Sequence, residues 1–427
     1  MPGAGTRTAV MPADPAILLD ISRLLSRLGR GTATGIDRVE AEWLAHLQTR
    51  DHLLLCRVPR GQLLLPPPAG AALLRWLAGD LADRRAPARG TACWAVTRCG
   101  CGRSGGCGAW RCAVWPRAPG PRRRFARRLG ADAAYLNLGH ANWDRRVMAA
   151  LSPLPRAVMV HDTIPLDHPE YTRQGQSALF RDRFAAVLAG ADLVLTVSQA
   201  SAQSVRDWQG RLRQRRALPV VAAPIGTRLA APDPAGLPPG LDLSRPFFVT
   251  LGTIEPRKNH ALLLDAWQEL SRRLDPPRLP QLFIVGSRGW ENAETFARLD
   301  ALPPGGPVRE LNGLDDGAVA ELLGRSHGLL MPSRAEGFGL PLTEAAARGI
   351  PVISAPLPVA RELLGGYARY LPPDDARAWA GAVALLAAAL PLRLPPHPVP
   401  QWDGHFAQVA AAIRERLPAG AAGAMPR

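Results

Sequence analysis

The stretch GLLMPSRAEGFGLPLTEAAARGIPVIS, residues 328–354, reads as a strand, a turn, a helix and a second strand. Gly328–Pro332 is a short apolar run typical of a buried strand, and Pro341–Arg348 is Ala-rich with a proline in its first turn, as at the start of a helix. Gly349 ends this helix, and Ile350–Ser354 predicts the next strand. This order indicates an α/β domain.

The turn in this unit and the helix after it contain the residues that we expect to bind a ligand. Glu336 and Glu344 stand with seven residues between them. Gly337 and Gly339 leave the backbone open to close approach, and the start of the following helix can hold an anion. The layout suits a ligand with sugar hydroxyls at one end, phosphate in the middle and a ribose at the other.

EGFGLPLTE (Glu336–Glu344) resembles the E-x7-E signature of the retaining glycosyltransferases of family 4, within the bacterial mannosyltransferase-like group 1 enzymes. Two other stretches agree. Thr250–Asn259 (TLGTIEPRKN) resembles the segment that supplies an Arg and a Lys to the donor diphosphate. Val160–Tyr171 (VHDTIPLDHPEY) resembles the His-Asp segment of the mannosyltransferase-like members. The resemblance implies the GT-B fold, in which two Rossmann-like parallel-sheet domains face each other across a cleft.

The resemblance also implies roles for individual residues. His161 is expected beside the donor sugar, with Asp162 orienting it or touching the acceptor. Glu336 would hold sugar hydroxyls, and Glu344 the ribose. The other expected contacts are Arg257 and Lys258 with the diphosphate, the backbone of Gly337, Phe338, Gly339 and Leu340 with its terminal phosphate, and Gly286 with the nucleotide. We further expect Glu255 to pair with a cation.

The expected chemistry depends on charge. When a nucleotide diphospho-sugar reacts, negative charge develops on the leaving diphosphate, and fixed cations and helix-start amides stabilise it. The sequence has no Asp-x-Asp motif to present a divalent metal. Arg257 and Lys258 would supply the charge, so we predict a metal-independent reaction with no cofactor other than the donor substrate. The family works by same-face attack, which disfavours Glu336 as a nucleophile.

The rest of the chain divides around these motifs. Residues 1–230 are expected to form an acceptor-side domain, with an irregular, partly disordered insertion at 66–130. A linker rich in Pro and Gly follows at 231–245. Residues 246–398 would form the domain that binds the nucleotide sugar. Gln401-Trp402-Asp403 resembles the entry to the family's closing helix, so residues 399–420 should cross back onto the first domain.

The net charge and the lysine content of the chain bear on which partners it can bind. The 427 residues carry a net charge of +16, which is compatible with nucleic acid, anionic lipid or phosphorylated substrates as partners. The positive charge is almost entirely Arg, and the one lysine is Lys258, inside the EPRKN motif. An ammonium can reach a phosphate oxygen where a guanidinium fork does not fit.

The insertion at 66–130 holds five of the six cysteines and a basic run. A zinc site is conceivable there, but no CxxC pair is present. The basic run could contact an anionic membrane surface, and a solvated loop is the alternative. The residues concerned are Cys93, Cys99, Cys101, Cys107 and Cys112, and Arg122, Arg123, Arg124, Arg127 and Arg128.

The predicted function is transfer of a hexose, with mannose as the candidate sugar, from a GDP- or UDP-linked donor to a glycan or lipid-linked acceptor of a cell-surface polysaccharide. The N-terminus lacks the apolar core of a signal peptide and no apolar run is long enough to span a bilayer, so we expect a cytoplasmic or peripheral protein. Three alternatives stand beside this one: a nucleotide-sugar epimerase, an inactive transferase-like scaffold, and a basic nucleic-acid-binding protein. The last is disfavoured because the basic run lacks interleaved aromatic residues.

Overall fold

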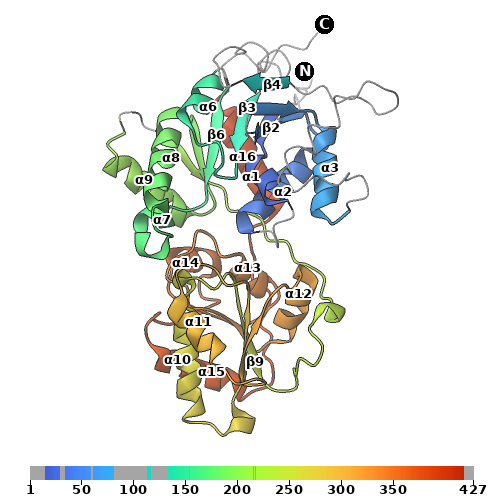
Figure 1. Ribbon diagram of the computed structural model, residues 1–427, viewed down its shortest axis with the longest axis vertical. Coiled ribbons are helices and arrows are strands. Elements are labelled where there is room, and N and C mark those ends of the chain that lie inside the picture. Colours follow the sequence, from blue (N-terminus) through green and yellow to red (C-terminus); the bar gives the residue numbers. More distant parts are fainter. Residues whose placement is uncertain are drawn as a thin grey trace, which may run out of the picture.

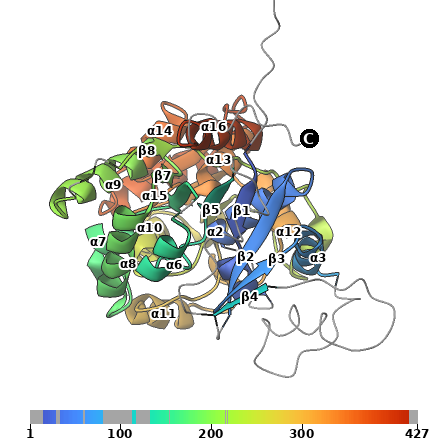
Figure 2. The same ribbon diagram turned by 90° about the horizontal axis from the view of Figure 1, so that it is seen from above.

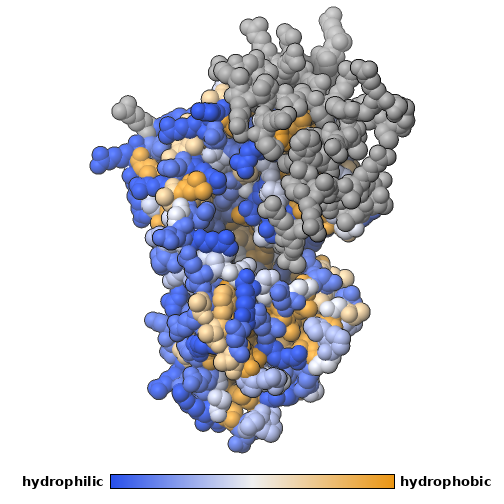
Figure 3. All heavy atoms as spheres, viewed as in Figure 1, coloured by the Kyte–Doolittle hydropathy of each residue, from blue (hydrophilic) through white to orange (hydrophobic). Residues whose placement is uncertain are grey.

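The protein folds into two lobes, each built on its own β-sheet (Figure 1). The structure is a computed structural model that describes residues 15–28, 34–58, 61–80, 133–152, 154–214, 216 and 218–417, together with the backbone of residues 113–116. The lobes meet at a narrow waist on the face seen in Figure 3.

The first lobe contains an eight-stranded sheet in the order β4-β3-β2-β1-β5-β6-β7-β8. Its strands are β1 (Ile17–Asp20), β2 (His52–Val58), β3 (Gly61–Leu65), β4 (Ala113–Pro116), β5 (Ala134–Asn137), β6 (Arg156–Val160), β7 (Leu193–Thr196) and β8 (Val220–Ala222). Pairing is parallel from β2 to β8, but β3 pairs antiparallel with both β2 and β4. The prediction of a parallel sheet is therefore wrong at this edge. Only two residues separate β2 from β3, too few for the crossover that a parallel pair needs.

Helices flank this sheet. They are α1 (Ser22–Arg27), α2 (Gly35–Leu47), α3 (Pro68–Leu77), α6 (Arg145–Ala150), α7 (Ile164–Asp167), α8 (Gln176–Gly190) and α9 (Gln199–Arg211), with the 3-10 helix η1 (Pro169–Tyr171). Helix α2 begins with a capping box, in which Thr34 and Asp37 satisfy each other's backbone N–H groups. Ser198, a residue type favoured at the N-cap, directly precedes helix α9 in the sequence, and its side chain accepts from the amide of Ser201.

The expectation of irregular chain over 66–130 is wrong at its beginning. Helix α3 has Pro68 in its first turn, where a missing N–H is harmless, and buries Ala69 and Leu73 four residues apart. It packs against α2. Residues 113–116 form strand β4. The five cysteines and the basic run named above lie outside the described residues, so the zinc and membrane predictions for them are not addressed by the structure.

The second lobe contains a six-stranded parallel sheet in the order β11-β10-β9-β12-β13-β14. Its strands are β9 (Phe247–Leu251), β10 (Gln281–Val285), β11 (Val308–Leu311), β12 (Gly328–Met331), β13 (Val352–Ser354) and β14 (Arg369–Tyr370). Its helices are α10 (His260–Ser271), α11 (Ala293–Asp300), α12 (Asp316–Arg325), α13 (Leu340–Ala347), α14 (Pro358–Leu364) and α15 (Ala376–Ala387), with the 3-10 helices η2 (Pro234–Gly236), η3 (Pro256–Lys258) and η4 (Pro276–Arg278). The predicted strand–turn–helix–strand unit is thus confirmed as β12, α13 and β13.

The central strands are mostly apolar because helices cover both faces of each sheet. Every residue of β1, β5, β9, β10 and β12 is buried. Between β8 and β9 the chain has no regular element except η2, in keeping with its Pro and Gly content.

Helix α16 (Trp402–Arg414) returns to the first lobe, as the sequence predicts (Figures 1 and 2). His405 accepts a hydrogen bond from the indole of Trp43 at 2.9 Å, and the ring of Phe406 meets that indole edge-on at 5.0 Å. Burying an aromatic side chain such as Phe406 contributes about 1.5–3 kcal/mol. The C-terminal end of the second lobe is thereby tied to helix α2 of the first. Within the described residues, no helix is both long and apolar enough to cross a membrane.

Candidate functional site

Two cations share the carboxylate of Glu336. Strands β9 and β12 are parallel neighbours, so the loops that follow them emerge at the same edge of the sheet. The ammonium of Lys258, after β9, lies 2.6 Å from one oxygen of Glu336, after β12. Arg257 donates to the other oxygen at 2.8 Å. The fold thus brings together three of the predicted site residues. Glu336 is 79 positions from Arg257 and 78 positions from Lys258 in the sequence.

This cluster is buried and ionised. Burial by itself would raise the pKa of Glu336, but the charges of Lys258 and Arg257 outweigh it and lower the pKa to about 2. Burial lowers the pKa of Lys258, and Glu336 opposes that change. The Glu336 side chain is only 6% exposed, so its attraction to the two cations is weakly screened by solvent.

A second carboxylate holds Arg257 from the other side. The Nε of Arg257 lies 2.5 Å from Glu255, which confirms that Glu255 pairs with a cation. Arg257 also donates to the carbonyl oxygen of Ala335 at 3.0 Å. Within the described residues its Nη2 has no acceptor, and the ammonium of Lys258 has three N–H groups for one carboxylate contact. Both cations are therefore oriented and still have hydrogens to offer a ligand.

The loop after Glu336 packs directly on the first lobe. A Cβ at Gly337 would lie 2.6 Å from the carbonyl oxygen of His161, so a side chain does not fit there. Ser198 and Ser201 of the first lobe donate to the carbonyl oxygen of Gly337 at 2.9 and 3.2 Å. The glycine that the sequence marks for ligand approach therefore also permits the two lobes to touch.

Helix α13 starts from a left-handed residue. Gly339 has φ 92° and precedes the helix, which has no side-chain cap at its N-terminus. Pro341 has no N–H, and the amide of Leu342 donates to the carbonyl oxygen of Gly339 at 2.9 Å. The amide of Leu340 is therefore the one at this helix start that the described residues leave available for the predicted phosphate contact. The side chain of Phe338 is buried in the core, so this residue can meet a ligand only through its backbone.

The structure gives Gly286 a packing role. A Cβ at this position would lie 2.1 Å from the carbonyl oxygen of Gly252, where the ends of β9 and β10 lie side by side. The absence of a side chain is thus explained by close contact between two backbones. The predicted nucleotide contact of Gly286 stays a prediction.

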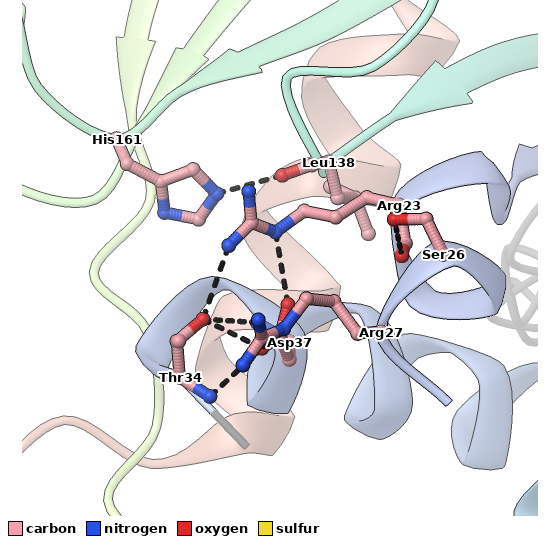
Figure 4. A network of polar contacts seen from close by, with 7 residues as sticks. All are labelled: Arg23, Ser26, Arg27, Thr34, Asp37, Leu138 and His161. Atoms are coloured by element: carbon pink, nitrogen blue, oxygen red, sulfur yellow. Dashed lines mark hydrogen bonds and ion pairs between the residues drawn. The ribbon is translucent and has the colours of Figure 1, made fainter. Parts of the chain in front are cut away.

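His161 and Asp162 end strand β6 opposite the Glu336 loop. The Nε2 of His161 donates to the carbonyl oxygen of Leu138 at 2.7 Å, which leaves Nδ1 as an acceptor (Figure 4). Burial lowers the pKa of His161 to about 4, so the ring is neutral at neutral pH. Burial raises the pKa of Asp162, and the charge of Arg257 opposes this rise. A Cβ at Gly337 would lie 3.0 Å from Cβ of Asp162, so the His-Asp segment lies against the Glu336 loop.

Glu344 forms an ion pair with an arginine that was not among the predicted site residues. Arg38, on helix α2 of the first lobe, reaches Glu344 at 3.4 Å and Asp316 at 2.5 Å. Burial raises the pKa of Glu344, and Arg38 opposes that rise. The available signal was the sequence GRGTATG, residues 29–35, which ends three positions before Arg38. Its partners in the second lobe could not be read from local pattern.

A second missed contact joins the lobes through a helix N-terminus. The carboxylate of Glu362, on α14, accepts from the amides of Gln199 and Ala200 at 2.8 and 2.9 Å. These are the first two residues of α9, so a side chain of the second lobe caps a helix of the first. The lobes are therefore joined by directional contacts on both sides of the Glu336 loop.

In the described part of the chain, no group of three or more His, Cys, Asp or Glu residues is placed to hold a metal ion.

Residues 238–391, most of the second lobe, match the family model of glycosyl transferases group 1. This lobe, with the Glu336 loop and the Arg257–Lys258 pair, is thus a group 1 glycosyltransferase domain.

Curated relatives agree with this assignment. The serotype-specific mannosyltransferase WbdA of Escherichia coli is 34% identical over 236 residues, which cover 52% of this chain and 29% of that protein. The O-antigen chain mannosyltransferase B of Escherichia coli is 30% identical, with 52% of this chain and 58% of that protein covered. The matches span less than two thirds of these relatives' own length.

Solved structures show the architecture. Anabaena HepE in complex with UDP superposes with a TM-score of 0.55 at 16% identity, over 94% of this chain and 98% of that one. A sucrose-phosphate synthase from Thermosynechococcus elongatus gives a TM-score of 0.51 at 15% identity, over 94% of both chains. The chain has the GT-B fold that the sequence predicts. Assignment to family 4 stays a prediction.

Proposed function

We propose that this protein is a retaining, metal-independent glycosyltransferase that transfers a hexose, most plausibly mannose, from a nucleotide diphospho-sugar to a glycan or lipid-linked acceptor in cell-surface polysaccharide synthesis. The observation that carries the proposal is the buried cluster of Arg257 and Lys258 on Glu336, directly before the uncapped start of α13. Two cations and the start of a helix lie together where a leaving diphosphate would need positive charge.

The proposed reaction makes use of this placement. The bond between the anomeric carbon and the diphosphate oxygen breaks, and its electron pair leaves with the diphosphate. An acceptor hydroxyl oxygen bonds to the same face of the anomeric carbon, and its proton passes to the leaving phosphate oxygen. Lys258 and Arg257 stabilise the charge that develops there. Glu336 and Glu255 hold the two cations in place, so little reorganisation is needed during the reaction.

The remaining site residues take supporting roles in this proposal. His161 is neutral and offers Nδ1 to a hydroxyl of the donor sugar. Glu344 exchanges its contact with Arg38 for the ribose hydroxyls when the donor binds. Mannose is favoured because relatives of this chain bear the name mannosyltransferase. A neighbour in fold binds UDP, so the panel of donors to be tested includes both GDP- and UDP-sugars.

A donor panel tests the proposal. GDP- and UDP-sugars are added to the full chain in the presence of EDTA, and thermal stabilisation, hydrolysis and transfer to alkyl glycosides are measured. We expect one donor to raise Tm in EDTA, this rise to be lost in Lys258→Ala, and NMR to show a product with the donor's anomeric configuration. Arg298→Gln, which removes an ion pair with Asp265 away from the Glu336 cluster, is the control. An inverted anomer, a strict metal requirement or conversion of the donor into another nucleotide sugar would each refute the corresponding part of the proposal.

A further inference from the structure

A guanidinium of the first lobe is held in place beside His161. Arg23, on helix α1, donates from Nε to Asp37 at 2.9 Å and from Nη2 to the hydroxyl of Thr34 at 3.2 Å (Figure 4). Figure 4 shows the group between the ring of His161 and the start of α2. Among the described residues none accepts a hydrogen bond from its Nη1. One edge of an oriented, permanently charged group is thus unused.

This guanidinium lies next to the parts of the first lobe that touch the Glu336 loop and α13. Thr34 is followed by Gly35, where a Cβ would lie 3.7 Å from the side chain of Leu340, the first residue of α13. On its other flank, the carbonyl of His161 is packed against Gly337. Arg23 therefore stands across the waist from the predicted phosphate contacts.

The charged groups of both lobes bear on whether an anion can bind at this place. In the second lobe, the two cations Arg257 and Lys258 already face the two carboxylates Glu255 and Glu336. A diphosphate carries more than one negative charge, so a further cation across the waist would add to the stabilisation that Arg257 and Lys258 provide. In the first lobe, Arg23 and Arg27 both pair with the carboxylate of Asp37.

Two buried acids of the same lobe, Glu40 and Asp20, also have shifted pKa values. Glu40 is fully buried, and burial holds its pKa well above its ordinary value. Burial likewise raises the pKa of Asp20, against hydrogen bonds from Ser22, Asn142 and Tyr135.

A purely structural role explains the position of Arg23 less well than a role in ligand binding. Thr34 and Asp37 cap α2 through their own backbone and side-chain contacts. Arg27 also reaches Asp37, at 3.3 Å, so that carboxylate keeps a cation without Arg23. The side chain of Arg23 is 26% exposed, which leaves it accessible to a ligand in the waist.

We propose that Arg23 is a ligand-binding residue that contacts a phosphate group held between the two lobes. The inference rests on the proposed function. The phosphate can belong to the nucleotide diphospho-sugar or to a phosphate-bearing lipid-linked acceptor, and both present the same oxyanion to the guanidinium.

The experiment uses the full chain and two kinds of ligand. Affinity for GDP, UDP and the corresponding nucleosides is measured by calorimetry. Transfer is then measured to an alkyl mannosyl phosphate and to the phosphate-free alkyl mannoside. The variants are Arg23→Gln, Arg23→Lys and, as a matched control, Arg298→Gln, whose side chain is 32% exposed and also pairs with one carboxylate.

If Arg23 meets the donor, Arg23→Gln weakens nucleoside diphosphate binding about tenfold, Arg23→Lys recovers part of it, and nucleoside binding is unchanged. If it meets the acceptor, nucleoside diphosphate affinity is unchanged, and KM rises about tenfold for the phosphate-bearing acceptor alone, with kcat retained.

Four outcomes would overturn the inference. Affinity and KM could both stay within about twofold of the wild type. Ligands without phosphate could lose as much as those with it, which would indicate a structural role. The wild type could bind no nucleoside diphosphate at all, which would refute the proposed function as well. Binding that Lys258→Ala abolishes but Arg23→Gln retains, with acceptor KM unchanged, would refute this inference alone.

Discussion

The ammonium of Lys258 lies 2.6 Å from the carboxylate of Glu336, so the chain's one lysine is paired with the first glutamate of its principal motif. The pair joins the loops after β9 and β12 and is nearly excluded from solvent. A Cβ at Gly252 would lie 3.1 Å from Cε of Lys258, so the stem of the lysine fills the space beside that glycine. The site therefore depends on both the charge and the narrow shape of the Lys258 side chain.

Replacing Lys258 is therefore expected to affect catalysis more than folding. Lys258→Ala should lower kcat/KM for the donor on the order of 100-fold or more, because a preorganised cation at the leaving group is lost. Lys258→Arg should stay at least about tenfold below wild type, because the guanidinium is too broad for the space beside Gly252. Steady-state kinetics with a saturating acceptor give both values. Full activity of Lys258→Arg would contradict the shape argument.

Gly337 should be intolerant of a methyl group. In Gly337→Ala the new Cβ would meet the carbonyl oxygen of His161 at 2.6 Å, and that backbone cannot swing aside as a flexible side chain could. We expect the lobes to be pushed apart at this loop and donor turnover to fall about tenfold or more.

The matched control is Gly381→Ala in α15, where nothing lies within 4 Å of the added group. It should keep full activity and gain about 0.5–1 kcal/mol in the free energy of unfolding, measured by urea denaturation. Equal loss of activity in both variants would show that the contact with His161 is unimportant.

Glu362 should influence how closely the lobes associate. Glu362→Gln keeps the shape but removes the negative charge at the start of α9, a change worth about 1 kcal/mol. If the contact holds the lobes together, the closed population should fall about fivefold relative to the open one. Small-angle X-ray scattering should then show a larger radius of gyration than for Glu415→Gln, a control at an exposed carboxylate. Identical scattering from the two variants would argue against a role in closure.

His161 should make the protein less stable in acid. Its folded pKa of about 4 lies below the ordinary value of 6.5, so the unfolded chain takes up a proton first as pH falls through this window. The free energy of unfolding should therefore decrease between pH 6.5 and pH 4, by up to about 3 kcal/mol from this residue.

His161→Gln keeps a donor for Leu138 and removes the titration. Urea denaturation at several pH values should show a shallower decline than in the wild type. His168→Gln, at an exposed site of the same lobe, is the comparison. A slope unchanged in His161→Gln would mean that the ring is not the group that becomes protonated.

Local patterns predicted the parts of the fold whose contacts are near in sequence. Apolar runs bounded by glycine and proline marked β12, α13 and β13, and Ser198 marked the start of α9. The antiparallel edge at β3 was missed although its cause, a two-residue connection, was visible. Helix α3 was missed because the mixed composition of the following segment obscured one short amphipathic stretch.

By itself, the sequence determined the second sheet, the Glu336–Glu344 motif and the two cations beside it, because strand periodicity, helix ends and motif spacing are properties of short segments. Only the tertiary structure decided that Lys258 pairs with Glu336, that Arg38 reaches Glu344, and that Gly337 rests on His161. These contacts join residues from 78 to 306 positions apart. Their geometry depends on how the strands are ordered and how the two lobes meet, and no short stretch of chain carries that information.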